Sequence, residues 1–228
     1  MKNQYVADVN DYRKYGLLRT LSGNGKIRTG VCWMLTQNDE GRDGQFRNYL
    51  YLPKKFRNFD PPLFDILKLV SAGERNVRHI ESENVIPNAV FHNDILSDVK
   101  EDRKHYFADM IDSFQRADLI FFDPDNGLEI GSLPCGRKRS SKYLYWSEVK
   151  DTFSSGKSIL VYQHFIRENR YNFIKRLSSD FCSLLNVQEV LAFNTSNVVF
   201  FLISQPKHAQ YFKERSDVLK EKWHKEIW

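Results

Sequence analysis

Short apolar runs alternate with longer amphipathic segments along most of the chain. Strand candidates, most of them apolar runs, occupy residues 27–35, 76–81, 88–91, 119–122 and 158–163. Segments with helical periodicity occupy residues 12–21, 60–72, 97–116, 146–154 and 165–185. The run at 119–122 is apolar at every position, which is typical of a strand buried on both faces. Strands that alternate with helices predict a parallel sheet covered by helices on both sides.

The pattern changes near the end of the chain. Two apolar runs, 187–193 and 198–203, are separated only by the polar residues 194–197. Four residues cannot hold a crossover helix, so we expect these two strands to form an antiparallel hairpin. The last segment, 207–228, is rich in charge and has a helical pattern. We therefore predict one α/β domain over residues 1–206 and a charged helical tail over residues 207–228.

The most informative polar segment follows the buried run at 119–122. It reads Asp123-Pro124-Asp125-Asn126, and Gly127 comes next. Ligands of open parallel sheets bind outside the carboxyl ends of the strands, which is where this acidic loop falls. Proline fixes one φ angle and glycine permits a sharp turn, so we expect a rigid loop. The alternative is a structural turn in which the acids cap backbone groups.

Charge adds a second candidate region. The net charge is +5, and four cations cluster at Arg137, Lys138, Arg139 and Lys142, directly before three aromatic residues. Cations next to aromatic side chains suit phosphate contacts beside base stacking, so this basic segment predicts nucleic-acid binding, to DNA or RNA. The alternative is an ordinary solvated loop.

Several classes of protein are disfavoured by composition. No apolar run approaches the roughly 20 residues of a membrane helix, and the first residues lack the apolar core of a signal peptide. The three cysteines are odd in number and form no CxxC pair, which argues against a disulfide framework or a zinc site. We expect a cytoplasmic protein that has no membrane partner and no resident metal.

The run Phe121-Phe122-Asp123-Pro124-Asp125-Asn126 resembles the catalytic loop of S-adenosylmethionine-dependent N6-adenine methyltransferases, which reads Asp-Pro-Pro-aromatic. The resemblance implies a Rossmann-like, methyltransferase-type three-layer fold and transfer of a methyl group to an exocyclic amine of a nucleic-acid base. It also implies that Asp123 and the Pro124 carbonyl hold the target amine. Asp125 and Asn126 stand where the family has its second proline and its aromatic, so base stacking would fall to Tyr143, Tyr145 or Trp146.

The same resemblance suggests where S-adenosylmethionine would bind. It places Glu81 on the ribose hydroxyls, the Asn93-Asp94 pair on the adenine, and Trp33 beside the cofactor at the end of the first strand. The usual glycine-rich loop is absent there, because the strand ends in Cys32-Trp33-Met34-Leu35. Residues 5–18, with Asp8, Asp11 and Lys14, resemble the first segment of a ribosomal-RNA adenine methyltransferase branch.

Two alternatives stay open. Pro124-Asp125 followed by Glu148-Val149-Lys150 matches the PD-(D/E)xK pattern of Mg²⁺-dependent nucleases, in which Asp125 and Glu148 would bind the metal and Lys150 would orient water. That interpretation needs Glu148 and Lys150 on a strand, whereas residues 147–153 have the pattern of a helix start. The second alternative is a methyltransferase-like binding protein without catalysis.

Overall fold

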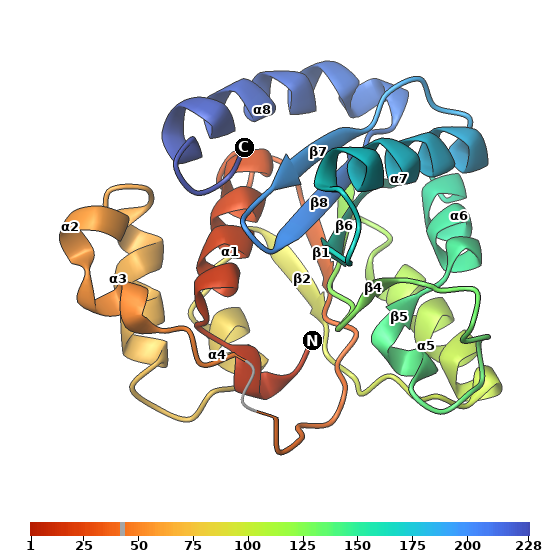
Figure 1. Cartoon of the computed structure of the whole chain (residues 1–228), viewed down its shortest axis with the longest axis horizontal. Coiled ribbons are helices and arrows are strands. Elements are labelled where there is room, and N and C mark those ends of the chain that lie inside the picture. Colours follow the sequence, from red (N-terminus) through yellow and green to blue (C-terminus); the bar gives the residue numbers. More distant parts are fainter. Residues whose placement is uncertain (42–43) are drawn as a thin grey trace.

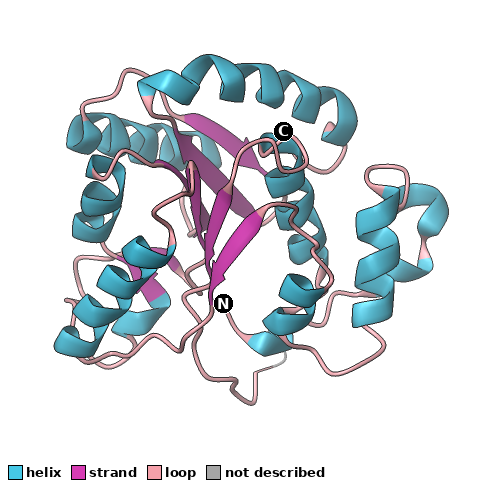
Figure 2. Cartoon of the chain, turned by 180° about the vertical axis from the view of Figure 1, so that it is seen from behind, coloured by secondary structure: helices cyan, strands magenta, loops and turns pink. Residues whose placement is uncertain are grey.

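The computed structural model describes residues 1–41 and 44–228 and shows a central sheet between two layers of helices (Figures 1 and 2). The strands of this sheet are β1 (Thr29–Cys32), β2 (Ala89–His92), β3 (Leu119–Phe122), β6 (Ser158–His164), β7 (Leu191–Asn194) and β8 (Val198–Ile203). Their order across the sheet is β2-β1-β3-β6-β8-β7, and β4 (Gly127–Leu128) pairs with β5 (Tyr143–Leu144) separately. The neighbours β2, β1, β3 and β6 are parallel, while β8 is antiparallel to both β6 and β7. The Rossmann-like fold and its antiparallel C-terminal hairpin are therefore confirmed.

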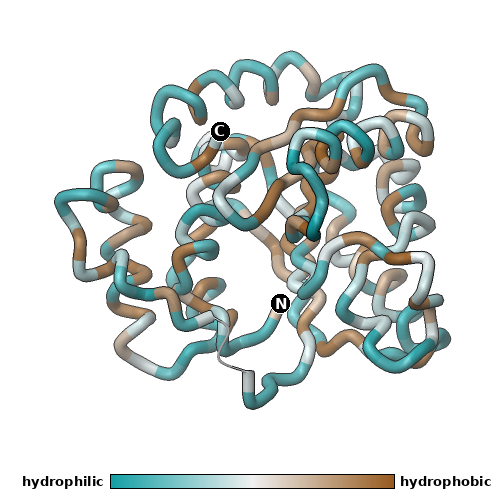
Figure 3. Tube along the Cα trace, viewed as in Figure 1, coloured by the Kyte–Doolittle hydropathy of each residue, from teal (hydrophilic) through white to brown (hydrophobic). Residues whose placement is uncertain are grey.

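The helices divide between the two faces according to the side chains that each strand presents. The longer helices are α1 (Val9–Leu21), α3 (Pro61–Val70), α5 (Lys100–Ser113), α6 (Trp146–Ser154), α7 (Arg170–Leu185) and α8 (Ala209–Trp223), and the short ones are α2 (Pro53–Phe56) and α4 (Val77–Ser82). Single 3-10 turns lie at Asn3–Tyr5, Asn48–Tyr51, Ser140–Lys142 and Pro206–His208. In β3, Leu119 and Phe121 face the core formed with α1, α3, α4 and α8, while Ile120 and Phe122 face α5, α6 and α7. This alternation is why β3 is apolar throughout, and Figure 3 shows the hydrophobic residues gathered in the central strands.

One predicted strand is wrong. Residues 76–81 do not extend the sheet but form most of α4, Val77–Ser82. The side chain of Asn76 accepts a hydrogen bond from the backbone N–H of Arg78, which makes Asn76 the N-cap of a helix. The apolar positions Val77 and Ile80 are both buried, and their spacing of three residues fits one face of a helix.

The C-terminal helix packs closely against the first helix. Trp223 of α8 is fully buried, and its indole lies against Gly16 of α1, where a Cβ atom would overlap the ring. The position of α1 on the sheet therefore depends on a residue that is distant in the sequence. No helix in the described ranges is long and apolar enough to span a membrane.

The strand order reverses at β1, because β2 lies on one side of it and β3 on the other. In open α/β sheets, the crevice outside the carboxyl ends of the strands at such a reversal is where ligands bind. The residues that follow β1, β2, β3 and β6 share this edge, so Trp33, Asn93, Asp123 and Phe165 begin the loops that build the candidate site.

Candidate active site

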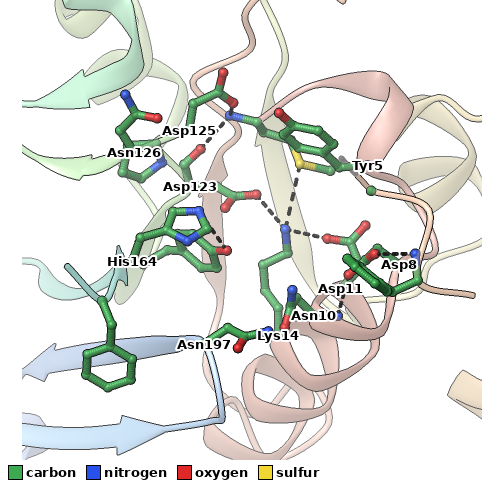
Figure 4. Close-up of a pocket in the computed structure, with 16 residues that line it drawn as sticks. Tyr5, Asp8, Asn10, Asp11, Lys14, Asp123, Asp125, Asn126, His164 and Asn197 are labelled. Atoms are coloured by element: carbon green, nitrogen blue, oxygen red, sulfur yellow. Dashed lines mark hydrogen bonds and ion pairs between the residues drawn. The ribbon is translucent and has the colours of Figure 1, made fainter. Parts of the chain in front are cut away.

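A cavity of about 540 Å³ opens at the carboxyl edge of the sheet, and the acidic loop forms one of its walls (Figure 4). The other walls come from the N-terminal residues, α1, residues 44–46, the end of β6 and the turn between β7 and β8. The lining residues are Met1, Tyr5, Asp8, Asn10, Asp11, Lys14, Gly44, Phe46, Asp123, Pro124, Asp125, Asn126, Tyr162, His164, Phe165 and Asn197. All four residues predicted for the catalytic loop, 123–126, therefore line one cavity.

Lys14 crosses from α1 to the acidic loop and lies between two carboxylates. Its Nζ atom is 2.6 Å from Oδ1 of Asp11 and 2.7 Å from Oδ2 of Asp123, and all three side chains are at most 4% exposed. Burial disfavours the charge of Lys14, but the two aspartates outweigh that effect and raise its pKa. Burial also raises the pKa of Asp11, to about 6, although Lys14 opposes the shift. Lys14 therefore stays cationic between the two carboxylates.

Asp125 makes a second set of buried charge contacts. Its Oδ1 lies 2.7 Å from the amino group of Met1, and its Oδ2 accepts a hydrogen bond of 2.7 Å from Thr36 Oγ1. The same amino group donates to the backbone carbonyl of Asp123 over 2.8 Å. Burial would raise the pKa of Asp125, but the amino group, Thr36 and Lys2 together lower it. Asp125 is therefore an anionic anchor that fixes the loop.

The end of the acidic loop is held from two sides. Gly127 has φ of 100°, a conformation that favours glycine, and a Cβ atom there would collide with the side chain of Gln163. Gln163 Oε1 accepts a hydrogen bond of 2.7 Å from the N–H of Leu128, and the N–H of Asn126 donates to the carbonyl of Lys142 over 2.9 Å. The rigid loop expected from proline and glycine thus gains its fixed position from β6 and from the basic segment.

His164 stands at the end of β6 and faces the cavity. Its Nε2 lies 3.3 Å from the hydroxyl of Tyr162, and burial lowers the pKa of His164. Burial and the nearby aspartates keep the pKa of Tyr162 well above its ordinary value, so the tyrosine keeps its proton in this pair. His164 is consequently neutral at neutral pH and sits next to the two acids of the loop.

The aromatic rings of the cavity differ from those expected. Tyr143, Tyr145 and Trp146 do not line it; Tyr145 is buried and donates from its hydroxyl to the Leu133 carbonyl. Phe46 lines it instead, and this residue is 70% exposed. The Phe46 backbone is fixed to the start of α1, because its N–H donates to Asp8 and its carbonyl accepts from Val9, each over 3.0 Å.

Three of the four predicted cofactor residues meet outside this cavity. Trp33 Nε1 donates to Glu81 Oε1 over 2.9 Å, and the amide of Asn93 donates to both carboxylate oxygens of Glu81. Asp94 is separate, with a side chain that is 79% exposed. Glu81 lies in α4, so it is not at the end of the strand predicted for residues 76–81. The second strand is β2, and the residues that follow it are Asn93 and Asp94.

The chain continues past β1 without a glycine turn. The Trp33 N–H donates to the His92 carbonyl, and the N–H of Leu96 donates to the Leu35 carbonyl. These bonds carry the contact between the β1 and β2 segments beyond the strands themselves. Residues 33–35 are buried there, which suits apolar side chains.

The basic segment lines a second, smaller cavity of about 330 Å³. Lys138, Arg139 and Lys142 belong to its walls, and Asn126 lines both cavities. Arg137 is exposed but does not line either one. The segment is shaped by Asp98, whose carboxylate accepts hydrogen bonds of 2.7 Å from the N–H groups of Arg139 and Ser141. Its cations are therefore presented by a fixed backbone beside the acidic loop.

The geometry required for the nuclease alternative is not present. Glu148 and Lys150 lie on α6, not on a strand. Arg103 donates to both carboxylate oxygens of Glu148, which also accepts from the N–H of Tyr145. Glu148 therefore caps the start of α6 and forms an ion pair with Arg103. No cluster of three or more His, Cys, Asp or Glu residues within 1–41 and 44–228 is arranged to hold a metal ion.

Comparisons with known proteins add little to this description. No protein-family model matches the sequence, and no curated protein matches it. Among solved structures, the chain is similar to human methyltransferase-like protein 13 in complex with SAH, at 11% identity and a TM-score of 0.38. The alignment covers 94% of this chain and 92% of that protein's chain. The strand order and the cavity, rather than this likeness, define the chain as a Rossmann-like α/β protein with an acidic site at the reversal of its sheet.

Proposed function

We propose that this chain is an S-adenosylmethionine-dependent methyltransferase that acts on an exocyclic amine of a nucleic-acid base. The observation that carries the proposal is the acidic loop after β3, which lines the main cavity and whose acceptors already bind amino groups. Asp123 binds the ammonium of Lys14 through its carboxylate and a second amino group through its backbone carbonyl. An exocyclic base amine presents the same kind of N–H donor.

The roles of the cavity residues follow from their positions. Lys14 engages Oδ2 of Asp123, which leaves Oδ1 to accept an N–H of the target amine. The Pro124 carbonyl would accept the second N–H, and the exposed ring of Phe46 would stack on the base in place of the missing loop aromatic. Neutral His164 would take the proton that the amine loses.

The cofactor would be held at the neighbouring loops after β1 and β2. The carboxylate of Glu81 is half-buried and is oriented by Trp33 and Asn93, yet one acceptor position on Oε2 remains for a ligand hydroxyl. This fits a ribose, and Asp94 is exposed at the same edge. When bound, S-adenosylmethionine supplies an electrophilic methyl group. The basic segment, with Arg137, Lys138, Arg139 and Lys142, would bind phosphates of the nucleic acid.

Calorimetric titration with S-adenosylmethionine and S-adenosylhomocysteine tests the proposal without any substrate. We expect saturable binding by the wild-type protein and a loss of about 10-fold or more in affinity for Glu81→Gln, which removes a charged hydroxyl acceptor. Glu83→Gln is the matched control, because Glu83 is exposed two residues further along. Transfer of labelled methyl groups to mixed nucleic acids then tests the reaction itself.

Absence of cofactor binding by the wild-type protein would refute the proposed activity. If the same protein still bound nucleic acid, the non-catalytic alternative, a methyltransferase-like binding protein, would replace it. Binding of cofactor without transfer to any nucleic acid would retain the methyltransferase and reject its substrate.

A further inference from the structure

A second segment with basic and aromatic residues begins at the wall of the main cavity, directly after β6. Phe165 lines the cavity, and the chain then runs along the surface to Tyr171 at the start of α7. Ile166 is 56% exposed and Tyr171 is 72% exposed. Arg167 is also exposed and makes no ion pair or hydrogen bond among the described residues. We call residues 165–171 the β6–α7 segment; it presents apolar, aromatic and cationic groups to solvent together.

The β6–α7 segment is held in place at both ends. The N–H of Phe165 donates to the Asn197 carbonyl over 3.3 Å, and the guanidinium of Arg170 donates to the Ser196 carbonyl. Asn169 caps α7 by accepting from the N–H of Asn172. Because the backbone of the segment is anchored, little backbone freedom is lost when a ligand binds its exposed side chains.

The charge of this region is positive. Residues 165–176 contain four cations and one acid. The acid, Glu168, pairs with Arg176 at 2.8 Å, so it does not neutralise Arg167. A polyanion is therefore the ligand that this surface complements.

The β6–α7 segment and the basic segment flank the main cavity on different sides. In Figure 4, His164 lies between Asn126 and Asn197. Asn126 also lines the basic second cavity, while the carbonyl of Asn197 binds the first residue of the β6–α7 segment. A chain of phosphates that ran from one segment to the other would therefore cross the mouth of the acidic cavity.

We propose that single-stranded nucleic acid follows this path and that one of its bases stacks on Tyr171. This inference rests on the proposed nucleic-acid substrate and adds its strandedness and its track. An exposed tyrosine ring offers a stacking face that only an unpaired base can cover, because the bases of a duplex are stacked on each other. Aromatic platforms beside cations are the general means by which proteins bind single strands.

Fluorescence anisotropy with labelled single-stranded and duplex oligonucleotides of mixed sequence tests the track, without any cofactor. We expect preference for single strands. Tyr171→Ala should weaken their binding about 5-fold or more, while Tyr171→Phe should bind like the wild type. Arg167→Ala should lower the slope of log affinity against log salt by about 0.7. Each side chain is at the surface, and melting temperatures would verify that the variants fold.

Two variants serve as matched controls. Tyr51→Ala removes a tyrosine that is 79% exposed, and Arg116→Ala removes an exposed arginine that precedes β3, at the opposite edge of the sheet. Both should bind like the wild type. The inference is overturned if Tyr171→Ala and Arg167→Ala match these controls, or if the wild type binds no single strand. The assay measures binding and needs no methyl transfer, so it still tests the proposed track if the protein is found to transfer no methyl group.

Discussion

Lys14 gives the sharpest test of how the first helix holds the acidic site. Its ammonium lies within 2.7 Å of carboxylate oxygens of both Asp11 and Asp123, and it is 3% exposed. It also lies over the rings of Tyr15, Trp33 and Tyr162, at 5.3 to 5.8 Å from their centroids. Lys14→Met keeps most of the volume and the flexible stem but removes the charge, so it isolates the electrostatic contribution.

The expected effect is large because two buried carboxylates lose their partner. Removing one member of a buried ion pair costs about 3–5 kcal/mol, since the remaining charge is left uncompensated. For a domain of this size, each kcal/mol lowers the melting temperature by about 2–4 °C, so a fall of about 6–20 °C is expected. That is a large part of the ~5–15 kcal/mol that holds a typical domain folded.

Calorimetric and urea unfolding would measure the loss, with Lys220→Met as the control. Lys220 forms a pair of the same kind with Asp217, but both side chains are 69% exposed, so its loss should hardly change the melting temperature. Asp11→Asn added to Lys14→Met should recover part of the stability, because one of the two unpaired charges is removed. A melting temperature for Lys14→Met as close to the wild type as that of the control would refute the electrostatic reasoning.

Three further predictions concern the site. Asp123→Ala should abolish methyl transfer while the cofactor affinity measured by calorimetry stays nearly unchanged, whereas Asp125→Ala should reduce transfer less and chiefly lower the melting temperature; the reverse ranking would contradict the assigned roles. Replacing the four cations of the basic segment by alanine should weaken nucleic-acid binding and lower its salt slope by about 0.7–0.9 for each phosphate that is no longer neutralised, whereas an unchanged slope would make it a solvated loop. The pKa of His164 is lowered from its ordinary value of about 6.5, so this histidine is neutral and can act as a base at neutral pH. We expect kcat/KM to fall at lower pH as His164 is protonated, and His164→Gln should remove this limb of the pH profile. An identical profile would exclude the role.

The sheet could be predicted because its signals are local. The four apolar residues of β3 favour a buried strand, and the four-residue gap between the two last apolar runs permits only a hairpin. The acidic loop could be located for the same reason, since the carboxyl end of a buried strand in this fold is a place for ligands. The strand predicted for residues 76–81 is wrong because so short a segment, with apolar residues only at Val77 and Ile80, does not distinguish a strand from a helix. The hydrogen bond of the Asn76 cap belongs to a helix.

The partners of the acidic loop could not be predicted, because they come from contacts distant in the sequence. Asp8, the N-cap of α1, is followed at spacings of three residues by Asp11 and Lys14, which indicates a polar face at the start of the helix. Nothing local indicates that this face is buried or that it meets Asp123. The pairing of Trp33 and Asn93 with Glu81 is of the same kind, since it joins residues after two strands to a short helix.

What places Lys14 under the acidic loop is the packing of the whole domain. Gly16, two residues further along α1, admits the indole of Trp223, so a larger residue there would push α1 or α8 away. A shift of α1 by even about one ångström would lengthen the distances from Lys14 to both carboxylates, and Coulomb energy in a buried site is sensitive to such changes. The geometry of the candidate active site therefore depends on the packing of α1 against α8, and on the small side chain that lets the two helices approach. The acidic loop supplies the chemistry, while α1, fixed by α8, supplies the positive charge that pairs with Asp123 and orients it.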